Sequence, residues 1–181
     1  VLANIDTRLA REQGKLDVVM LSGGEPTLYP WLEELLAALV ARPIVRILVN
    51  TNGLRVAQDD ALVALLRRHR ERVEVYLQYD GETAEASRFH RGADLRRFKE
   101  AALQRLSSAE VFTTLTMTAT RGVNDDQIGA VVKRALDPPF VGGVTIQPVF
   151  SSGRGPGVNP MDRLTHTGVL ARLGQQTGGR V

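Results

Sequence analysis

Leu16–Leu21 (LDVVML) is followed directly by Ser22–Thr27 (SGGEPT), and this junction decides the fold. The first stretch is a short apolar run, which is typical of a buried strand. The second contains two glycines that leave backbone N–H and C=O groups uncovered, followed by a glutamate and a turn proline. A strand that ends in such a cluster either makes a tight turn with a solvated glutamate or presents a binding site. The rest of the chain decides between these two readings.

The composition is that of one soluble domain. The chain has 181 residues, of which 43% are apolar and 24% charged, and 23 basic and 20 acidic residues give a net charge of +3. Arg67, Arg68, Arg70 and Arg72 fit a solvated helix face better than a nucleic-acid surface. No apolar run reaches the roughly 18 residues of a membrane span. We therefore expect a single cytoplasmic domain over residues 1–181, with no nucleic-acid partner and no membrane span.

Five strand-like runs alternate with helical stretches. The runs are short and largely apolar on both faces, as expected for parallel strands covered by helices. We predict strands at Leu16–Leu21, Ile44–Val49, Val73–Tyr79, Val111–Met117 and Val144–Val149. Apolar residues recur between them at helical spacing, in stripes that begin at Leu32, Leu62, Leu95 and Ile128. Right-handed crossovers would place the strands in sequence order, in an α/β barrel or an open sheet.

Local signals indicate where some helices begin. Pro30 is placed for a first helical turn, where its missing N–H costs nothing. Asn124 and Gln127 have the spacing of a capping box, with Asn124 as the cap and Gln127 reaching back to it. We predict that His90 and Arg91 lie in an extended segment before a helix.

Polar residues follow every predicted strand. The carboxyl ends of parallel strands meet at one edge, where ligands bind. One polar strand end is routine, because the chain leaves a sheet through turn residues, but several on one rim indicate a polar small-molecule site. We predict no metal ligand and no catalytic side chain in this chain, since no histidine has a partner at metal-ligand spacing. The candidate binding residues are Gly23, Gly24, Glu25, Pro26, Thr51, Asn52, Gln78, Asp80, Thr118, Gln147 and Arg154.

The order of these motifs resembles the radical S-adenosylmethionine (radical SAM) superfamily. Ser22–Thr27, Thr51–Gly53 and Gln78–Gly81 stand in the order seen in that family, and Arg121–Asp125 is similar to a turn common in it. The resemblance covers residues 16 to 179 and implies a partial (β/α)6 barrel of the TIM type, here lacking its first strand.

Part of the sequence is similar to a narrower group within that superfamily. Leu48–Arg55, Val75–Gly81 and His90–Leu95 resemble the archaeal tetraether lipid synthases and related methanogen proteins, several of which transfer methyl or alkyl groups. This resemblance implies lipid coupling or methylation as the reaction. It leaves open whether the substrate is a small molecule, a lipid or a peptide.

The superfamily resemblance also implies roles for individual residues. In the family the Gly-Gly-Glu motif holds the amino group of the methionine part of SAM, a role that maps onto Gly23, Gly24 and Glu25. Later strand ends, with Asn52 and Gln78 ranked first, would reach the carboxylate or ribose. A strand threonine such as Thr118 is as typical of β structure, and an aspartate before a glycine, as at Asp80, is as typical of a turn. Gln147 and Arg154 are candidates for the adenine or substrate end.

The family also uses a 4Fe–4S cluster, and this chain departs from that pattern. A cluster fed by an electron donor cleaves SAM to a 5′-deoxyadenosyl radical, and its ligands are cysteines in a C-x-x-x-C-x-x-C loop. This chain has no cysteine. We expect the loop and the first strand to lie upstream of the helix at Val1–Gly14, so that this fragment is inactive by itself. The uncovered edge of Leu16–Leu21 is then expected to favour self-association.

Two other classes of protein remain open. One is a degenerate relative that binds SAM or another nucleotide without a cluster. The other is an ordinary α/β enzyme with a chance glutamate turn, although the sequence contains neither the G-x-G-x-x-G nor the G-x-x-x-x-G-K phosphate motif.

Overall fold

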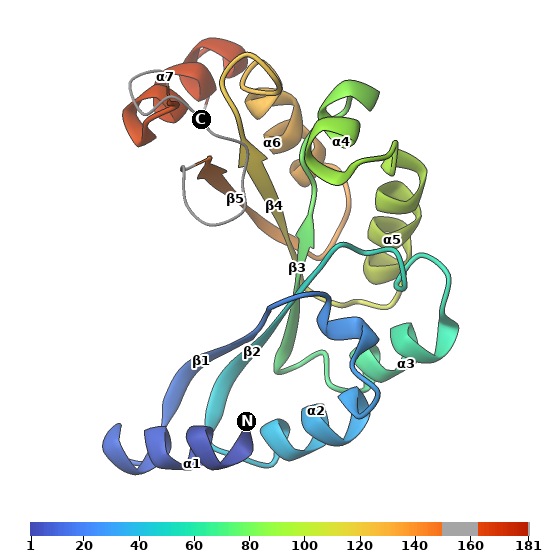
Figure 1. Cartoon of the computed structure of the whole chain (residues 1–181), viewed down its shortest axis with the longest axis vertical. Helices are drawn as coiled ribbons and strands as arrows, with labels where there is room; N and C mark the ends of the chain where they lie inside the picture. Colours follow the sequence, from blue (N-terminus) through green and yellow to red (C-terminus); the bar gives the residue numbers. More distant parts are fainter. Residues whose placement is uncertain (150–162, 181) are drawn as a thin grey trace.

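The computed structural model describes residues 1–149 and 163–180, which form one curled sheet with helices along its outside (Figure 1). The strands are β1 (Leu16–Leu21), β2 (Ile44–Thr51), β3 (Val73–Gln78), β4 (Thr113–Ala119) and β5 (Val141–Pro148). The helices are α1 (Leu2–Arg11), α2 (Leu32–Val40), α3 (Asp60–Arg68), α4 (Ala84–Arg91), α5 (Arg96–Ser108), α6 (Ile128–Leu136) and α7 (His166–Thr177), with a short 3₁₀ turn η1 (Pro26–Leu28) after β1.

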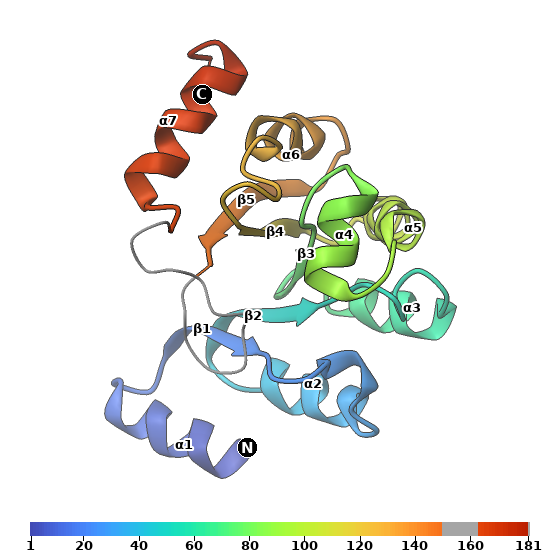
Figure 2. The same ribbon diagram turned by 45° about the horizontal axis from the view of Figure 1, so that its top comes forward.

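The sheet is parallel throughout, in the order β1-β2-β3-β4-β5. Strand order follows chain order, as right-handed crossovers require. The strands curl into a half-barrel, and α2, α3, α5 and α6 lie along its outer side (Figure 2). The predicted α/β fold with a partial TIM-type barrel is therefore confirmed. Among the described strands β1 pairs only with β2, so that it forms one edge of the sheet.

Alternate residues of the strands face the helices and make the core. Ile47, Val75, Leu77 and Leu115 are fully buried. They share one cluster with the helix residues Leu36, Leu39, Leu62, Leu66, Leu103, Leu106, Ile128 and Val131. The side chains between them point to the opposite face, inside the half-barrel.

The described helices cover only the outer face of the sheet. In a barrel the helices form an outer ring, and the inner face is left to the strands themselves. On β3 burial accordingly alternates between buried and half-buried residues. At the edge, Val18 and Met20 of β1 are 53% and 43% exposed.

Two helix starts differ from the sequence predictions. Helix α2 begins at Leu32, so Pro30 precedes it, because the chain first turns out of η1 and the amide of Leu32 bonds to the carbonyl of Tyr29 at 3.2 Å. Asn124 and Gln127 do not form a capping box. The Gln127 side chain instead accepts hydrogen bonds from the amides of Glu82 and Thr83 at 2.8 and 3.2 Å. The Gln127 amide group thereby ties the loop after β3 to the start of α6.

The segment that contains His90 and Arg91 is helical, not extended. Both residues lie in the last turn of α4. Thr83 caps the start of this helix by accepting a hydrogen bond from the amide of Ala86 at 3.3 Å. Gly92 ends it in the left-handed conformation, with φ of 76°. Helix α4 therefore begins after a threonine cap and ends at a glycine. It contains too few apolar residues to show the stripe by which a helix is predicted from sequence.

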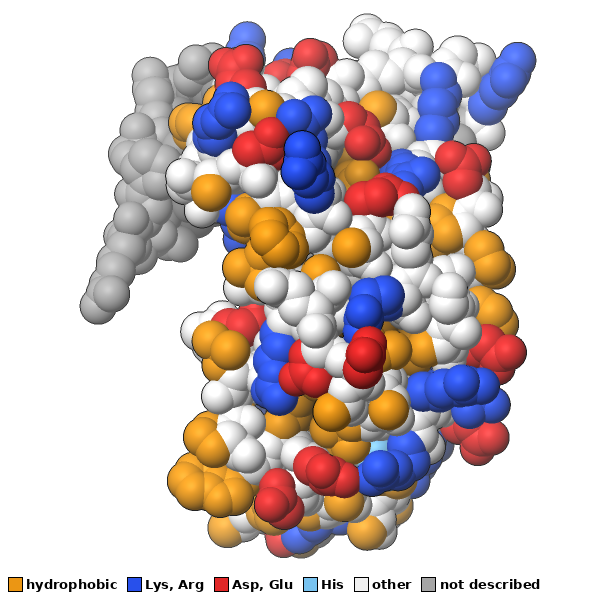
Figure 3. Space-filling view, turned by 90° about the vertical axis from the view of Figure 1, so that its right-hand side faces the viewer, with side chains coloured by type: hydrophobic (Ala, Val, Ile, Leu, Met, Phe, Trp, Pro, Cys, Tyr) orange, Lys and Arg blue, Asp and Glu red, His pale blue; other side chains and the backbone are white. Residues whose placement is uncertain are grey.

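Acidic and basic side chains alternate over the outer helices (Figure 3). Arg68, predicted to be solvated, is 61% exposed and pairs with Glu33 across α2 and α3 at 2.6 Å. Arg72 differs from that prediction, because its guanidinium turns inward and donates to the carbonyls of Val40 and Arg42 at 2.7 and 2.8 Å. Within residues 1–149 and 163–180, no helix has the length and apolar character needed to cross a bilayer.

Candidate functional site

The Glu25 carboxylate lies where the ends of β1 and β2 meet. Its Oε1 accepts hydrogen bonds from the Thr27 amide at 3.1 Å, the Thr27 hydroxyl at 2.8 Å and the Thr51 hydroxyl at 2.7 Å. Its Oε2 accepts one, from the Asn52 amide at 2.7 Å. All four donors are uncharged, and within residues 1–149 and 163–180 no basic side chain forms an ion pair with this carboxylate. Because Oε2 accepts a single hydrogen bond, it has room for a further donor.

The turn after β2 is built to make this contact. Thr51 is fully buried, and its hydroxyl also accepts a hydrogen bond from the Gly53 amide at 3.1 Å. The Asn52 side chain accepts a hydrogen bond from the Leu54 amide at 2.9 Å, which closes an Asx turn. Gly53 has φ of 79°, and a Cβ there would lie 2.5 Å from Leu77. Only glycine fits this position, and the two residues before it are held in one conformation.

Two glycines and a pocket flank Glu25 on its other side. Gly23 and Gly24 have φ of 94° and 56°, and a Cβ on either would meet nothing within 4 Å. Their backbone is therefore open rather than packed against protein. Pro26 starts η1, which turns the chain away from the motif. The pocket beside them measures about 570 Å³ and is lined by Val1, Met20, Leu21, Ser22, Gly23, Glu25, Pro26, Leu28, Tyr29, Pro30, Leu32 and Leu35.

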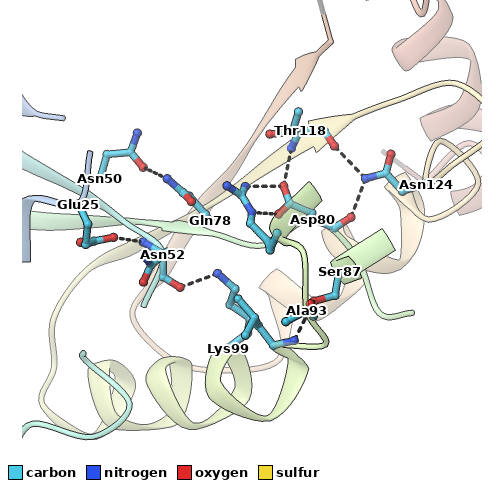
Figure 4. A network of polar contacts seen from close by, with 12 residues as sticks. Glu25, Asn50, Asn52, Gln78, Asp80, Ser87, Ala93, Lys99, Thr118 and Asn124 are labelled. Carbon is cyan, nitrogen blue, oxygen red and sulfur yellow. Dashed lines mark hydrogen bonds and ion pairs between the residues drawn. The ribbon is translucent and has the colours of Figure 1, made fainter. Parts of the chain in front are cut away.

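A second carboxylate, Asp80, follows β3 in a different setting. Its side chain is 3% exposed and pairs with Arg91 of α4 through both oxygens, at 2.5 and 2.9 Å. One oxygen also accepts a hydrogen bond from the Thr118 amide at 3.1 Å. The side chain of Asn124 donates to the main-chain oxygens of Asp80 and Thr118 at 2.7 and 2.8 Å (Figure 4). The ends of β3 and β4 are joined by this network.

The remaining predicted residues are distributed around the rim. Gln78 donates to the Asn50 side chain at 3.2 Å, and both amides lie on the inner face of the half-barrel. Gln147 is exposed on β5 and lies opposite Thr118 in the strand register. Arg154 lies outside the described residues. The structure thus unites Glu25 with the β2 turn and Asp80 with the end of β4, and places Gln147 on β5 beside Thr118 of the Asp80 group.

Lys99 is a member of this rim that the sequence analysis missed. It belongs to α5, is only 6% exposed, and donates to the Asn52 main-chain oxygen at 2.5 Å (Figure 4). Burial lowers the pKa of its ammonium to about 8; Arg91 also lowers it, while Asp80 and Glu25 act in the opposite direction. A signal was present in the sequence. Lys99 stands four residues after Leu95 and three before Ala102, on the stripe where apolar residues were expected.

His90 is a second buried polar group near the Asp80 network. Its Nε2 is buried and has no hydrogen-bond partner in the described part of the chain. Burial lowers the pKa of its imidazole, and the charge of Asp80 opposes this shift. Within the described residues, no three His, Asp or Glu side chains are grouped as metal ligands would be.

The chain is similar to known proteins in both sequence and structure. Residues 4–135 match the model of the radical SAM superfamily. The 7,8-dihydro-6-hydroxymethylpterin dimethyltransferase of Methanocaldococcus jannaschii is 26% identical over 176 residues. That alignment covers 96% of this chain but only 34% of the relative, so the chain spans about a third of that protein's length.

Solved structures show the same fold. A domain of a pyruvate-formate lyase-activating enzyme from Bacteroides vulgatus has a TM-score of 0.64 at 14% identity, covering 90% of this chain and 93% of that one. The protein anSMEcpe with bound AdoMet has a TM-score of 0.65 at 20% identity, covering 96% of this chain and 51% of that one. At these identities the likeness concerns the fold alone. Because the family model spans well over half of the sequence, the chain belongs to the radical SAM superfamily.

Proposed function

We propose that this chain binds SAM and that Glu25 holds the amino group of its methionine part. One observation carries the proposal: four uncharged donors fix the Glu25 carboxylate at the edge of a pocket, and no basic side chain of the described residues is paired with it. An ammonium ion is the natural ligand for such a carboxylate, because a charge-assisted hydrogen bond is stronger than a neutral one. The open backbone of Gly23 and Gly24 would lie along the bound methionine chain.

Other predicted residues divide into two groups under this proposal. Thr51 and Asp80 act by positioning, since the hydroxyl of Thr51 donates to Glu25 and both oxygens of Asp80 are taken by Arg91. Asn52 contributes its amide to Glu25. The residues that we propose contact the nucleoside part of SAM are Gln78, Thr118, Gln147 and, outside the described residues, Arg154.

The cluster of the family does not fit the residues of this chain. Iron–sulfur clusters are held by thiolates, and the sequence contains no cysteine. A 4Fe–4S cluster held by other residues of the full-length protein would supply one-electron reducing chemistry to the bound SAM. We propose that its ligands come from outside these 181 residues, so that this chain alone binds SAM without cleaving it.

We propose methyl transfer as the reaction of the full-length protein. The observation that favours it over lipid coupling is the similarity to a pterin dimethyltransferase along almost the whole of this chain. A reduced hydroxymethylpterin is therefore the first substrate to offer, together with methyl-labelled SAM. Label in the pterin supports the proposal, whereas SAM cleavage without label in the pterin assigns the enzyme to another substrate.

The binding proposal is tested by Glu25→Gln, which keeps the shape of the side chain and removes its charge. We expect SAM affinity, measured by calorimetry in the full-length protein, to fall at least tenfold. Glu34→Gln is the matched control, because Glu34 is an exposed glutamate on α2, and its affinity should match the wild type. Equal affinity of wild type and Glu25→Gln would show that Glu25 does not hold the ligand.

A further inference from the structure

A buried lysine from the outer helix layer supports the turn that holds Glu25. The Lys99 ammonium donates to the Asn52 carbonyl at 2.5 Å, and the Asn52 amide donates to Glu25 at 2.7 Å. One residue therefore receives the cation on its oxygen and passes its N–H to the carboxylate. Figure 4 shows Lys99 reaching up from α5 to this turn.

The same face of α5 lies close to the turn at a second point. A Cβ on Gly53 would lie 3.3 Å from the Cβ of Ala102, which is three residues after Lys99 and therefore on the same side of the helix. Ala102 thus limits how far the turn can approach α5, while Lys99 holds the turn in contact. Together they fix the position of the Asn52 backbone relative to α5.

This arrangement is costly for folding. A lysine is almost never this buried without an ionic partner, and the described residues provide Lys99 with one hydrogen-bond acceptor and no ion pair. Glu25 and Asp80 act on its charge only from a distance, and Arg91 repels it. Replacing a buried charge by an apolar side chain of similar volume is often neutral or stabilising. A residue that folding alone does not favour is best explained by the site that it serves.

We infer that Lys99 is a positioning residue, which holds the Asn52 turn and, through the Asn52 amide, the Glu25 carboxylate in the geometry that binds the ligand. The inference rests on the proposed function only in naming that ligand as SAM. Lys99 itself does not line the pocket beside Glu25, so it acts through the turn and not by contact with the ligand.

The test compares Lys99→Met with the wild type in the full-length protein. We expect SAM affinity to fall at least tenfold while the thermal midpoint stays the same or rises. Amide hydrogen exchange should become faster at residues 51–53 and remain unchanged in α5 and the rest of β2. Lys133→Met, which replaces an exposed lysine of α6, is the control and should change neither property. Should Lys99→Met fail to fold, Lys99→Gln takes its place, with the same expected results.

Two results would overturn the inference. One is wild-type affinity and wild-type exchange at residues 51–53 in the variant. The other is a lowered midpoint with faster exchange throughout α5 and the sheet, since Lys99 would then stabilise the fold in general. Failure of the wild type to bind SAM would refute the proposed function instead, and the exchange data would still decide whether Lys99 holds the turn.

Discussion

Glu25 and Asp80 each follow a parallel strand at the same rim, but the donors around them differ in charge. Four neutral groups hold Glu25, whereas the guanidinium of Arg91 neutralises Asp80. A carboxylate held by amides and hydroxyls is oriented and stays available to a cation. In a carboxylate that pairs with a guanidinium through both oxygens, the charge is already compensated. Under the proposed function, the end of β1 is the part of the rim that binds the ligand, and the end of β3 is the part that stabilises the rim.

The largest effect should come from breaking the Asp80 pair. Asp80→Ala leaves Arg91, 23% exposed, without its partner, and we expect the free energy of unfolding to fall by about 3 kcal/mol. Urea denaturation measures this change. Asp94→Ala is the control, because it removes an ion pair with Arg96 that is much more exposed, and its midpoint should match the wild type. Equal stability of the two variants would contradict the structural role of Asp80.

Lys99 gives a pH dependence whose sign follows from burial. Its pKa falls from 10.5 in the unfolded chain to about 8 in the folded protein. Below pH 8 Lys99 is protonated in both the folded and the unfolded state, so the whole cost of burying its charge lowers the stability. From pH 8 to 10.5 the unfolded state binds more protons than the folded state, so the free energy of unfolding rises with pH. We expect the wild type to gain about 2 kcal/mol relative to Lys99→Met between pH 7 and pH 10.

The comparison with Lys99→Met also isolates this contribution from other groups. Burial raises the pKa of Tyr79, an effect that both proteins share and that lowers stability only above pH 10. A stability difference that stays flat from pH 7 to pH 10 would show that Lys99 is not desolvated as the structure indicates. The measurement is urea denaturation of both proteins across this range.

A smaller effect is expected at Thr51, one of the neutral donors to Glu25. Thr51→Val removes one donor to Glu25 and leaves the buried Gly53 amide without its acceptor. The expected loss is about 1–2 kcal/mol in the free energy of unfolding, together with a few-fold loss of SAM affinity. Thr145→Val, at a half-buried strand threonine of β5, is the control. A stable variant with unchanged affinity would show that the Thr27 and Asn52 donors orient Glu25 without help.

Sequence patterns predicted the fold well, because strand runs and helix stripes carry the information that fixes strand order. They also located Glu25, Thr51 and Asn52 at one rim. They did not reveal whether the carboxylate at each strand end is paired with a cation. The partner of Asp80 lies eleven residues away, on a helix that has no apolar stripe. Lys99 was missed for a related reason. Helical spacing predicts an apolar residue at every position on the buried face of a helix, and Lys99 occupies such a position on α5.

The smallest effect is expected at an exposed ion pair whose separation nearly equals that of the buried pair of Arg91 and Asp80. Arg68 and Glu33 approach to 2.6 Å, almost as close as Arg91 and Asp80 at 2.5 Å, but both surface side chains are 61% exposed. Water and salt screen an exposed pair, and ordering two long side chains offsets most of its attraction. Glu33→Gln should therefore change the free energy of unfolding by less than about 0.5 kcal/mol in urea denaturation. A loss as large as that of Asp80→Ala would mean that the separation of the two charges, and not their burial, sets the strength of both ion pairs.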